Sequence, residues 1–254
     1  YDFAQSRPGI MVWNGTSWSD LRRFTGAYFE GIRMAYDGTN LYVGGSFIRG
    51  YGAPALYATN AAIWNGTTWA PMVVGRSADT VHALKCAGGD LYVGGTFTTV
   101  GAGGSVAANR VAKWNGTTWA SLGSGLNGTV YALAHDGTNL YVGGSFTTAG
   151  GVAATNVAMW NGTAWTNMGS GFDSTVKSLE YAGGNLYAGG TFTNAGSVAA
   201  ARVAKWVSGT VENSGVAPST GSWTGGYPVV ITGTNLGNGA DITNVTLCGV
   251  AVDS

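Results

Sequence analysis

The chain repeats itself, and the length of the repeat constrains the fold more than any other feature of its 254 residues. A tryptophan recurs after 51, 50, 46 and 46 residues, at Trp13, Trp64, Trp114, Trp160 and Trp206. The stretch Leu-Tyr-x-Gly-Gly recurs with matching spacing, at 41–45, 91–95, 140–144 and 186–190. Self-similarity at this period is typical of arrays in which each unit buries a face against its neighbours.

Four of these tryptophans open a hexapeptide that reads Trp-Asn-Gly-Thr-x-Trp, such as the segment 114–119. Asn-Gly favours a two-residue type I′ turn, which predicts a hairpin with Trp114 opposite Thr117 and Ala112 opposite Trp119. The two indoles would then be diagonal neighbours on one face. We interpret the hexapeptide as a structural clamp. The tryptophans assigned this packing role are Trp13, Trp18, Trp64, Trp69, Trp114, Trp119, Trp160, Trp165 and Trp206.

Each unit reads as four strands, which in the third unit are expected at about 130–135, 140–147, 156–160 and 163–168. Four strands in 46–50 residues is the size of one propeller blade. The expected fold is therefore all-β, a β-propeller of four-stranded blades. Four full units begin near residues 31, 81, 130 and 176.

An orphan hairpin at 10–21 precedes the four units. It either pairs with the last unit and completes a ring, or belongs with further blades before Tyr1. The last unit loses the hexapeptide, because Trp206 is followed by Val-Ser-Gly-Thr. A degenerate last unit of this kind is typical of a terminal cap.

A Gly-Gly doublet followed by a tryptophan 16 to 19 residues later resembles a kelch-type propeller repeat. The segments V-A-K-W-N-G-T-x-W and L-Y-V-G-G-x-F-T-x-A-G-G resemble kelch-like repeats of large secreted and cell-surface proteins. The resemblance covers roughly residues 10–212 and assigns 1–212 to a kelch-like propeller domain. It implies a fold and leaves the activity open, since propellers carry many unrelated functions.

The segment 213–254 resembles the first half of an IPT/TIG domain, an immunoglobulin-like sandwich of secreted and surface proteins. Half a sandwich cannot cover its own inner face. We therefore expect that the polypeptide continues, or that another chain supplies the missing strands. The matching residues are Pro218, Gly221, Gly225, Gly226, Val229, Ile231, Gly233, Asn235, Leu236 and Gly237.

Charged residues form only 9% of the chain, and 12 basic residues balance 12 acidic ones. No basic stripe is present for a nucleic-acid backbone, so nucleic acid is not expected as a partner. No apolar run approaches the length of a membrane span. A weakly charged surface offers little repulsion between copies, which favours self-association or a covering of attached sugar.

The search for chemistry finds no catalytic residue, no metal site and no cofactor site. Cys86 and Cys248 have no metal-ligand spacing, and their pairing cannot be read from the sequence. His135 shares its repeat position with Tyr36, Cys86 and Tyr181, which favours a packing role. His82 shares another with Ile32, Tyr131 and Lys177.

Asp37 and Asp136 stand in repeated Asp-Gly-Thr-Asn turns. Asp and Asn favour tight turns, so these residues are interpreted as structural.

One region departs from the repeat and carries charged and aromatic residues at one end of the array. Tyr and Arg are enriched at interfaces, so we expect a contact patch there. The alternative is a long loop that packs on its own unit. The candidate residues are Arg22, Arg23, Tyr28, Phe29, Glu30, Arg49, Tyr51 and Tyr57.

Six asparagines fit the pattern N-x-S/T and are candidate N-glycosylation sites. Four of them open the hexapeptide turn, which accounts for them without any sugar, although a hairpin tip is also exposed. The six are Asn14, Asn65, Asn115, Asn127, Asn161 and Asn244.

Three function classes are compatible with these observations. The expected one is a non-enzymatic extracellular or cell-surface protein, structural or adhesive, whose copies associate into a filament or matrix. The alternative is an extracellular propeller module that binds glycans or proteins. An enzyme is the third, and it would need a cluster of carboxylates with Arg or Tyr that the sequence does not display.

Overall fold

The computed structural model describes residues 9–25, 31–47, 49–51, 56–207, 210–212, 245–247 and 250–252. Within these ranges the protein is all-β. Its main elements are four antiparallel sheets of four strands, which follow one another along the chain in step with the repeat.

In each of these four sheets the strands lie side by side in the order in which they occur along the chain. The first sheet contains β3 (Arg33–Tyr36), β4 (Leu41–Gly44), β6 (Asn60–Trp64) and β7 (Trp69–Val73). The second contains β8 (Val81–Ala87), β9 (Asp90–Gly95), β12 (Val111–Trp114) and β13 (Trp119–Ser121). The third contains β14 (Thr129–His135), β15 (Leu140–Ser145), β18 (Val157–Trp160) and β19 (Trp165–Asn167). The fourth contains β20 (Val176–Ala182), β21 (Asn185–Gly190), β24 (Val203–Val207) and β25 (Thr210–Glu212).

Smaller elements complete the described chain. A three-stranded sheet joins β1 (Gly9–Trp13), β2 (Trp18–Thr25) and β5 (Arg49–Tyr51), in the order β1-β2-β5. Short two-stranded ribbons join β10 (Thr99–Val100) to β11 (Val106–Ala107), β16 (Thr148–Ala149) to β17 (Val152–Ala153), and β22 (Asn194–Ala195) to β23 (Val198–Ala199). The one described helical turn is η1 (Ala102–Gly104), and β26 (Val245–Leu247) pairs with β27 (Val250–Val252).

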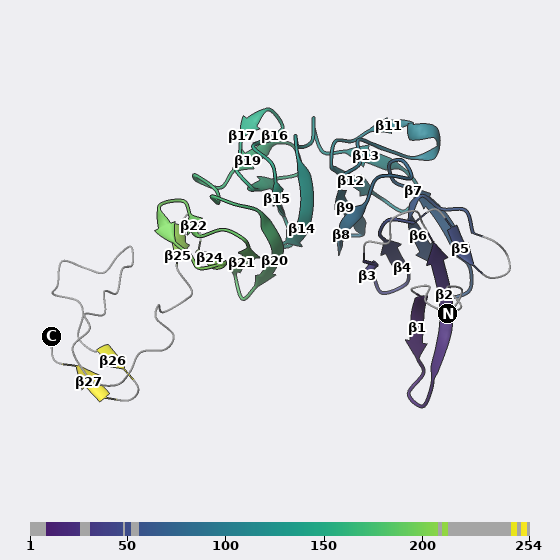
Figure 1. Cartoon of the computed structure of the whole chain (residues 1–254), viewed down its shortest axis with the longest axis horizontal. Helices are drawn as coiled ribbons and strands as arrows, with labels where there is room; N and C mark the ends of the chain where they lie inside the picture. The colour runs from purple at the N-terminus through teal and green to yellow at the C-terminus, as the bar shows by residue number, and fades with distance from the viewer. Residues whose placement is uncertain are drawn as a thin grey trace, which may run out of the picture.

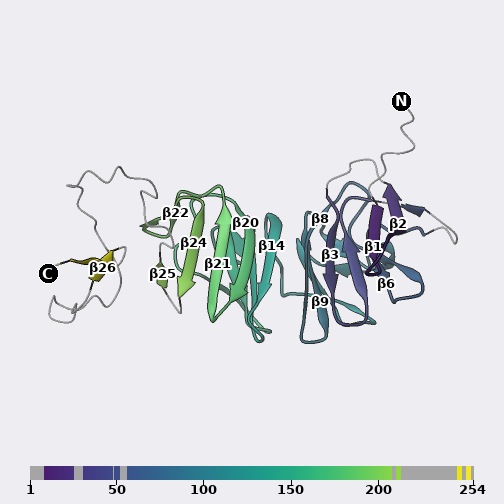
Figure 2. The same cartoon turned by 90° about the horizontal axis from the view of Figure 1, so that it is seen from below.

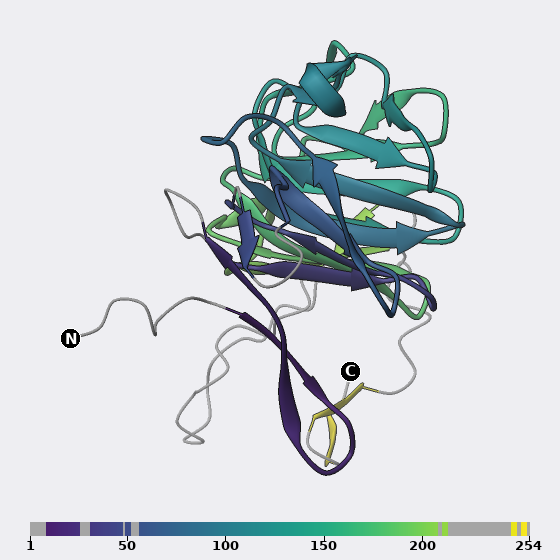
Figure 3. The same ribbon diagram turned by 90° about the vertical axis from the view of Figure 1, so that its right-hand side faces the viewer.

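The N-terminal hairpin β1–β2 does not pair with the last unit. Its second strand pairs with β5, and the fourth sheet draws its outer strand β25 from its own unit. Figure 3 shows the loop end of this hairpin reaching away from the four sheets. Closure of a ring by this hairpin is therefore not found among the described residues.

The four sheets stand side by side along an open arc (Figure 1). Their first strands lie on the inner side of the arc, where β3 contacts β8, β8 contacts β14, and β14 contacts β20. Figure 2 shows these strands following one another across the molecule. Side chains at one repeat position on successive first strands are thereby brought to one surface.

The hydrophobic core lies between neighbouring sheets. The interface between the third and fourth sheets buries Val157, Val176, Leu179 and Phe192, and equivalent clusters separate the other pairs of sheets. At the N-terminal end, Ile10 of β1 packs on the first sheet in the same way. Because each sheet covers one face of the next, the array is held together by contacts between neighbours.

In the first three sheets, the first glycine of the doublet sets the close approach of the next sheet. A methyl group at Gly143 would lie 2.5 Å from Val176 Cγ1 and 3.1 Å from Leu179 Cδ1 of the following first strand. Gly44 stands in the same relation to Val81 and Leu84. The branched side chain occupies the space that a Cβ atom would need, so glycine is required there.

The predicted register of the tryptophan hairpins is wrong. Trp114 pairs directly with Trp119, and a four-residue loop replaces the two-residue turn. Asn115 Oδ1 accepts hydrogen bonds from the backbone N–H groups of Thr117 (3.0 Å) and Thr118 (2.8 Å). The asparagine side chain holds the loop, so only Gly116 needs positive φ (96°).

Another repeat position adopts left-handed backbone without glycine. Asn60 (φ 61°) and Asn156 (φ 64°) lie four residues before a hexapeptide tryptophan, as does Arg110 (φ 68°). The buried Asn156 side chain donates to the carbonyl of Phe172 (2.8 Å), and Asn60 donates to that of Val74 (2.9 Å). These hydrogen bonds compensate a backbone conformation that is uncommon for residues other than glycine.

Candidate functional site

A cluster of polar and aromatic side chains lies on the inner side of the arc. The Tyr131 ring stands between His82, whose ring centroid is 4.9 Å away, and Lys177, whose Nζ lies 3.6 Å from the Tyr131 centroid. The three residues come from three neighbouring first strands, β8, β14 and β20. The Lys177 contact has cation–π geometry, which fixes the ammonium group over the ring.

A depression of about 680 Å³ opens beside this cluster. Its rim carries the cations Lys177 and Arg110 and the carboxylate of Asp79. Asp79 accepts a hydrogen bond from the backbone N–H of Arg76 (2.7 Å), and the Arg110 guanidinium donates to the carbonyl of Thr96. The residues that line it are Ala78, Asp79, Thr80, His82, Thr96, Arg110, Tyr131 and Lys177.

Arg33 extends the cluster toward the first sheet. Its Nε donates a hydrogen bond to the carbonyl of His82 (3.0 Å), so a third cation lies near Lys177 and Arg110. Sequence reasoning placed His82, Tyr131 and Lys177 at one repeat position but did not foresee their contact. The available signal was that one repeat position holds residues of four different chemical kinds.

The other histidine position is a stacking position. His135 stacks on Tyr92 of the preceding sheet (5.7 Å between centroids), and Tyr181 stacks on Tyr141 (5.9 Å). Burial lowers the pKa of His135 and raises the pKa of the Cys86 thiol to about 11. Cys86 is therefore a protonated, unreactive thiol near neutral pH. Cys248 lies outside the described residues.

The carboxylates of the Asp-Gly-Thr-Asn turns are held by local hydrogen bonds. Asp136 accepts from the backbone N–H groups of Thr138 (2.7 Å) and Asn139 (2.6 Å) and from the hydroxyl of Tyr141 (2.8 Å). Partial burial raises the pKa of Asp136, but these hydrogen bonds outweigh it and lower the pKa to about 2. Asp37 has the same environment, and its pKa also lies at about 2. Both act as ionised acceptors that organise a turn.

The predicted contact patch is only partly within the described residues. Arg22 and Arg23 lie in β2, Arg49 and Tyr51 lie in β5, and Arg23 pairs with Tyr51. Tyr57 is 68% exposed. Tyr28, Phe29 and Glu30 lie outside the described residues, so the patch stays a prediction.

The candidate glycosylation residues within the described ranges are exposed and hydrogen-bonded through their oxygen atoms. Asn14, Asn65, Asn115 and Asn161 accept the hydrogen bonds of their own loops at Oδ1, and glycan attachment leaves this atom unmodified. Asn127 also donates from Nδ2 to Thr147 Oγ1 (2.7 Å). Asn244 lies outside the described residues.

The paired tryptophans differ in exposure along the array. Trp13 and Trp18, with ring centroids 5.4 Å apart, are 50% and 64% exposed. Trp165 is buried, and its Nε1 donates to the carbonyl of Leu122 (2.7 Å). Residues of the preceding unit cover the Trp160–Trp165 pair, whereas the pair at the N-terminal end stays open.

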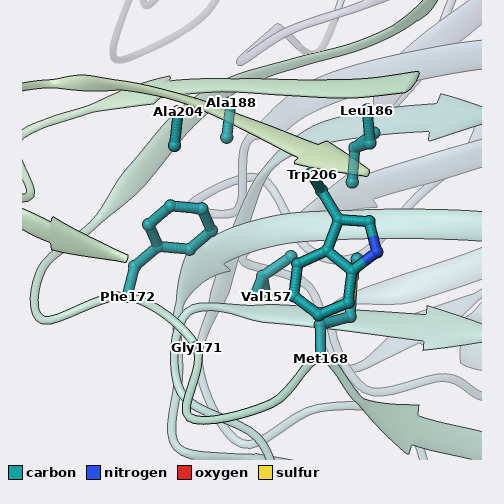
Figure 4. Close-up of a pocket in the computed structure, with 8 residues that line it drawn as sticks. All are labelled: Val157, Met168, Gly171, Phe172, Leu186, Ala188, Ala204 and Trp206. Atoms are coloured by element: carbon teal, nitrogen blue, oxygen red, sulfur yellow. The ribbon is translucent and has the colours of Figure 1, made fainter. Parts of the chain in front are cut away.

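A small apolar cavity lies between the third and fourth sheets (Figure 4). Its volume is about 10 Å³, and Phe172, Val157, Met168 and Trp206 point into it. A dry apolar space of this size is a packing void and holds no ligand.

The described residues contain no group of three or more His, Cys, Asp or Glu side chains that could hold a metal ion. Likewise, none of the helical residues described forms a segment long and apolar enough to span a membrane.

Comparison with known proteins adds little to this description. No family model and no curated protein matches the chain. Among solved structures, the crystal structure of the computationally designed Ika8 protein aligns with a TM-score of 0.41 at 15% identity. The alignment covers 71% of this chain and 46% of the Ika8 chain, so this chain spans less than half of that protein's length.

Proposed function

We propose that the chain is a non-enzymatic extracellular structural or adhesive protein that works by association of its copies. The observation that carries the proposal is the position of the large hydrophobic side chains left exposed. Among the described residues, most of them lie on the two ends of the array and few on its middle sheets. Those at the ends are Met11, Val12, Trp13, Trp18, Met34, Tyr36, Tyr187 and Val203. Exposed apolar surface of this kind is typical of interaction sites.

The architecture proposed for this role is a kelch-like β-propeller over residues 1–212, followed by an IPT/TIG segment over 213–254. Four-stranded sheets on an arc, with their first strands inside, support the propeller. For the IPT/TIG segment, support comes from the sequence pattern alone.

An extracellular or cell-surface location is part of the proposal. It is supported by the balanced charge of the chain and by the exposed Asn-x-Ser/Thr loops. Because charge repulsion between copies is weak, little opposes close approach of neutral surfaces.

The test is electron microscopy in negative stain, with sedimentation velocity of the full chain in parallel. We expect oligomers or filaments whose proportion increases with protein concentration. A single monomeric species at every concentration would rule out association as the function.

The second candidate is a binding module, and the inner cluster is the specific observation in its favour. Tyr131 and Lys177 beside an open depression offer a ring face and a cation, a combination that suits an acidic sugar. A glycan array distinguishes this candidate from pure self-association. Binding that is lost in both Tyr131→Ala and Lys177→Gln would favour it, and binding unchanged in these variants would exclude this site.

A further inference from the structure

One four-residue loop recurs along the described chain, with asparagine as its first residue in some copies and aspartate in others. In the tryptophan hairpins it reads Asn-Gly-Thr-x, and between the first two strands of two sheets it reads Asp-Gly-Thr-Asn. In every copy the backbone N–H of the first residue donates to the carbonyl of the fourth residue, at 3.2 Å. These loops begin at Asn14, Asp37, Asn65, Asn115, Asp136 and Asn161.

The first side chain makes the same hydrogen bonds whether it is an amide or a carboxylate. Asn115 Oδ1 accepts from the backbone N–H groups of the third and fourth loop residues, at 3.0 and 2.8 Å. Asp136 Oδ1 accepts from the equivalent groups at 2.7 and 2.6 Å. The second residue has φ 96° at Gly116 and 100° at Gly137. The fold therefore accepts aspartate where the tryptophan hairpins have asparagine.

Asparagine is a thermolabile residue, and it loses its side-chain ammonia most readily before glycine, which leaves the next backbone nitrogen unhindered. A Cβ atom at Gly116 would meet no other atom within 4 Å, so this glycine stands in open space. In the described part of the chain, its N–H donates to no acceptor. The two backbone N–H groups on Asn115 Oδ1 would stabilise the negative charge that develops on this oxygen when the nitrogen attacks.

We propose that the four Asn-Gly-Thr loops are sites of spontaneous deamidation, which converts each asparagine to an acidic residue within the folded chain. The glycine nitrogen, on losing its proton, attacks Cγ of the asparagine. A new C–N bond forms, the Cγ–Nδ2 bond breaks, and Nδ2 takes up the proton and leaves as ammonia. Water then opens the resulting succinimide ring, at Cγ to give aspartate or at the main-chain carbonyl to give isoaspartate. The sites are Asn14, Asn65, Asn115 and Asn161.

Each conversion adds one negative charge to an exposed loop. The chain has 12 basic and 12 acidic residues, so four added carboxylates would take the formal net charge from 0 to −4. Copies of the chain that begin neutral would then repel one another. The modification goes beyond the proposed function and does not depend on it.

Asn127 is an internal control, because it begins the same Asn-Gly-Thr triplet outside these loops. Its Nδ2 donates to Thr147 Oγ1 (2.7 Å), and its Oδ1 accepts from the backbone N–H groups of Thr147 (2.9 Å) and Thr148 (3.0 Å). The amide is thereby tied at both ends to another segment of the chain. A Cβ atom at Gly128 would collide with the carbonyl oxygen of Ser145, so this glycine is enclosed. We expect the fold to protect this asparagine.

The test is peptide mapping by mass spectrometry of the full chain, made in a host without N-glycosylation and incubated in mildly alkaline heavy-oxygen water. Base favours the deprotonated nitrogen, and the water that opens the ring leaves heavy oxygen in the new carboxyl group. In the folded chain, the four loop asparagines are expected to convert at least about 10-fold faster than Asn127. In urea, where neither set of contacts exists, these rates should become similar.

A matched variant tests whether the fold accepts the product. Asn115→Asp creates the aspartate of one conversion, and its melting temperature should equal that of the wild type or exceed it, because the hydrogen bonds of the loop are then made to a charged acceptor. Asn115→Gln is the control, because its longer side chain cannot form the five-membered ring. Circular dichroism confirms that both variants fold.

The outcomes decide between selection by the fold and a property of the sequence alone. Loop asparagines that convert in the folded chain while Asn127 is retained, with the difference lost in urea, support the proposal. Asn127 converting as fast as the loops in the folded chain overturns selection by the fold. Loop asparagines that convert in urea but persist in the folded chain overturn the proposal, since the loop then protects them. A marked loss of stability in Asn115→Asp overturns the acceptance of aspartate.

Discussion

At the scale of the single residue, the spacing between sheets depends on an absent methyl group. Gly143 faces Val176 and Leu179 of the next sheet, and its backbone has no positive φ that would itself demand glycine. The constraint is therefore steric and comes from a residue more than thirty positions away. A glycine doublet in a strand pattern does not disclose this, since turns, bulges and close contacts all use glycine.

Replacing Gly143 with Ala should lower the free energy of unfolding by about 1–3 kcal/mol, because the new Cβ overlaps Val176 Cγ1. Urea denaturation followed by tryptophan fluorescence measures the loss. The pair Gly143→Ala/Val176→Ala should cost less than the sum of its two single changes, since the smaller neighbour makes room. Strict additivity would show that the two sites are not in steric contact.

At the scale of the element, a tight turn is stabilised by one ionised carboxylate. Asp136 receives three donors from the turn and from Tyr141, and its pKa lies at about 2. A folded-state pKa below the unfolded value means that the carboxylate contributes stability above the unfolded pKa. This contribution is lost as the pH falls toward about 2.

Asp136→Asn should therefore be less stable than the wild type near neutral pH, and the difference should shrink as the pH falls from about 5 to about 2. Thermal melts across this range measure it. Asp37→Asn, in the equivalent turn, should show the same pH profile, since the pKa of Asp37 is also about 2. A stability difference independent of pH would exclude ionisation as the cause.

Strands could be predicted from the sequence where a local pattern determines them. Contacts that depend on residues far away in the sequence could not. In the third unit the repeat predicted four strands, and β14, β15, β18 and β19 follow in that order. The Asn-Gly pair misled because the Asn115 side chain closes a longer loop. The inner cluster of His82, Tyr131 and Lys177 depends on how sheets pack, and a strand pattern does not encode that angle.

At the scale of the whole molecule, each of the four sheets makes its main contacts, among the described residues, with its immediate neighbours along the arc. Stability in such arrays is approximately a sum of unit terms and neighbour terms. The second and third sheets have a neighbour on both faces, whereas the fourth has one described neighbour.

Native-state hydrogen exchange should therefore decrease in protection from the middle of the array to its ends. Amides of β14 and β15 should exchange most slowly, and those of β24 and β1 faster. Mass spectrometry of peptic peptides measures this gradient. A parallel measurement at a protein concentration low enough for the chain to be monomeric removes any protection due to association. Uniform protection along the array would indicate a fully cooperative unit.

The close packing of one unit against the first glycine of the preceding doublet has a consequence for how such a chain can change in length. Gly44 and Gly143 each accept a valine and a leucine of the following unit, so these joints have the same shape. A unit duplicated or deleted by recombination would meet a matching surface on each side, without compensating substitutions. The array is therefore open to growth by whole units, while a single methyl group added at one of these glycines would disrupt a joint.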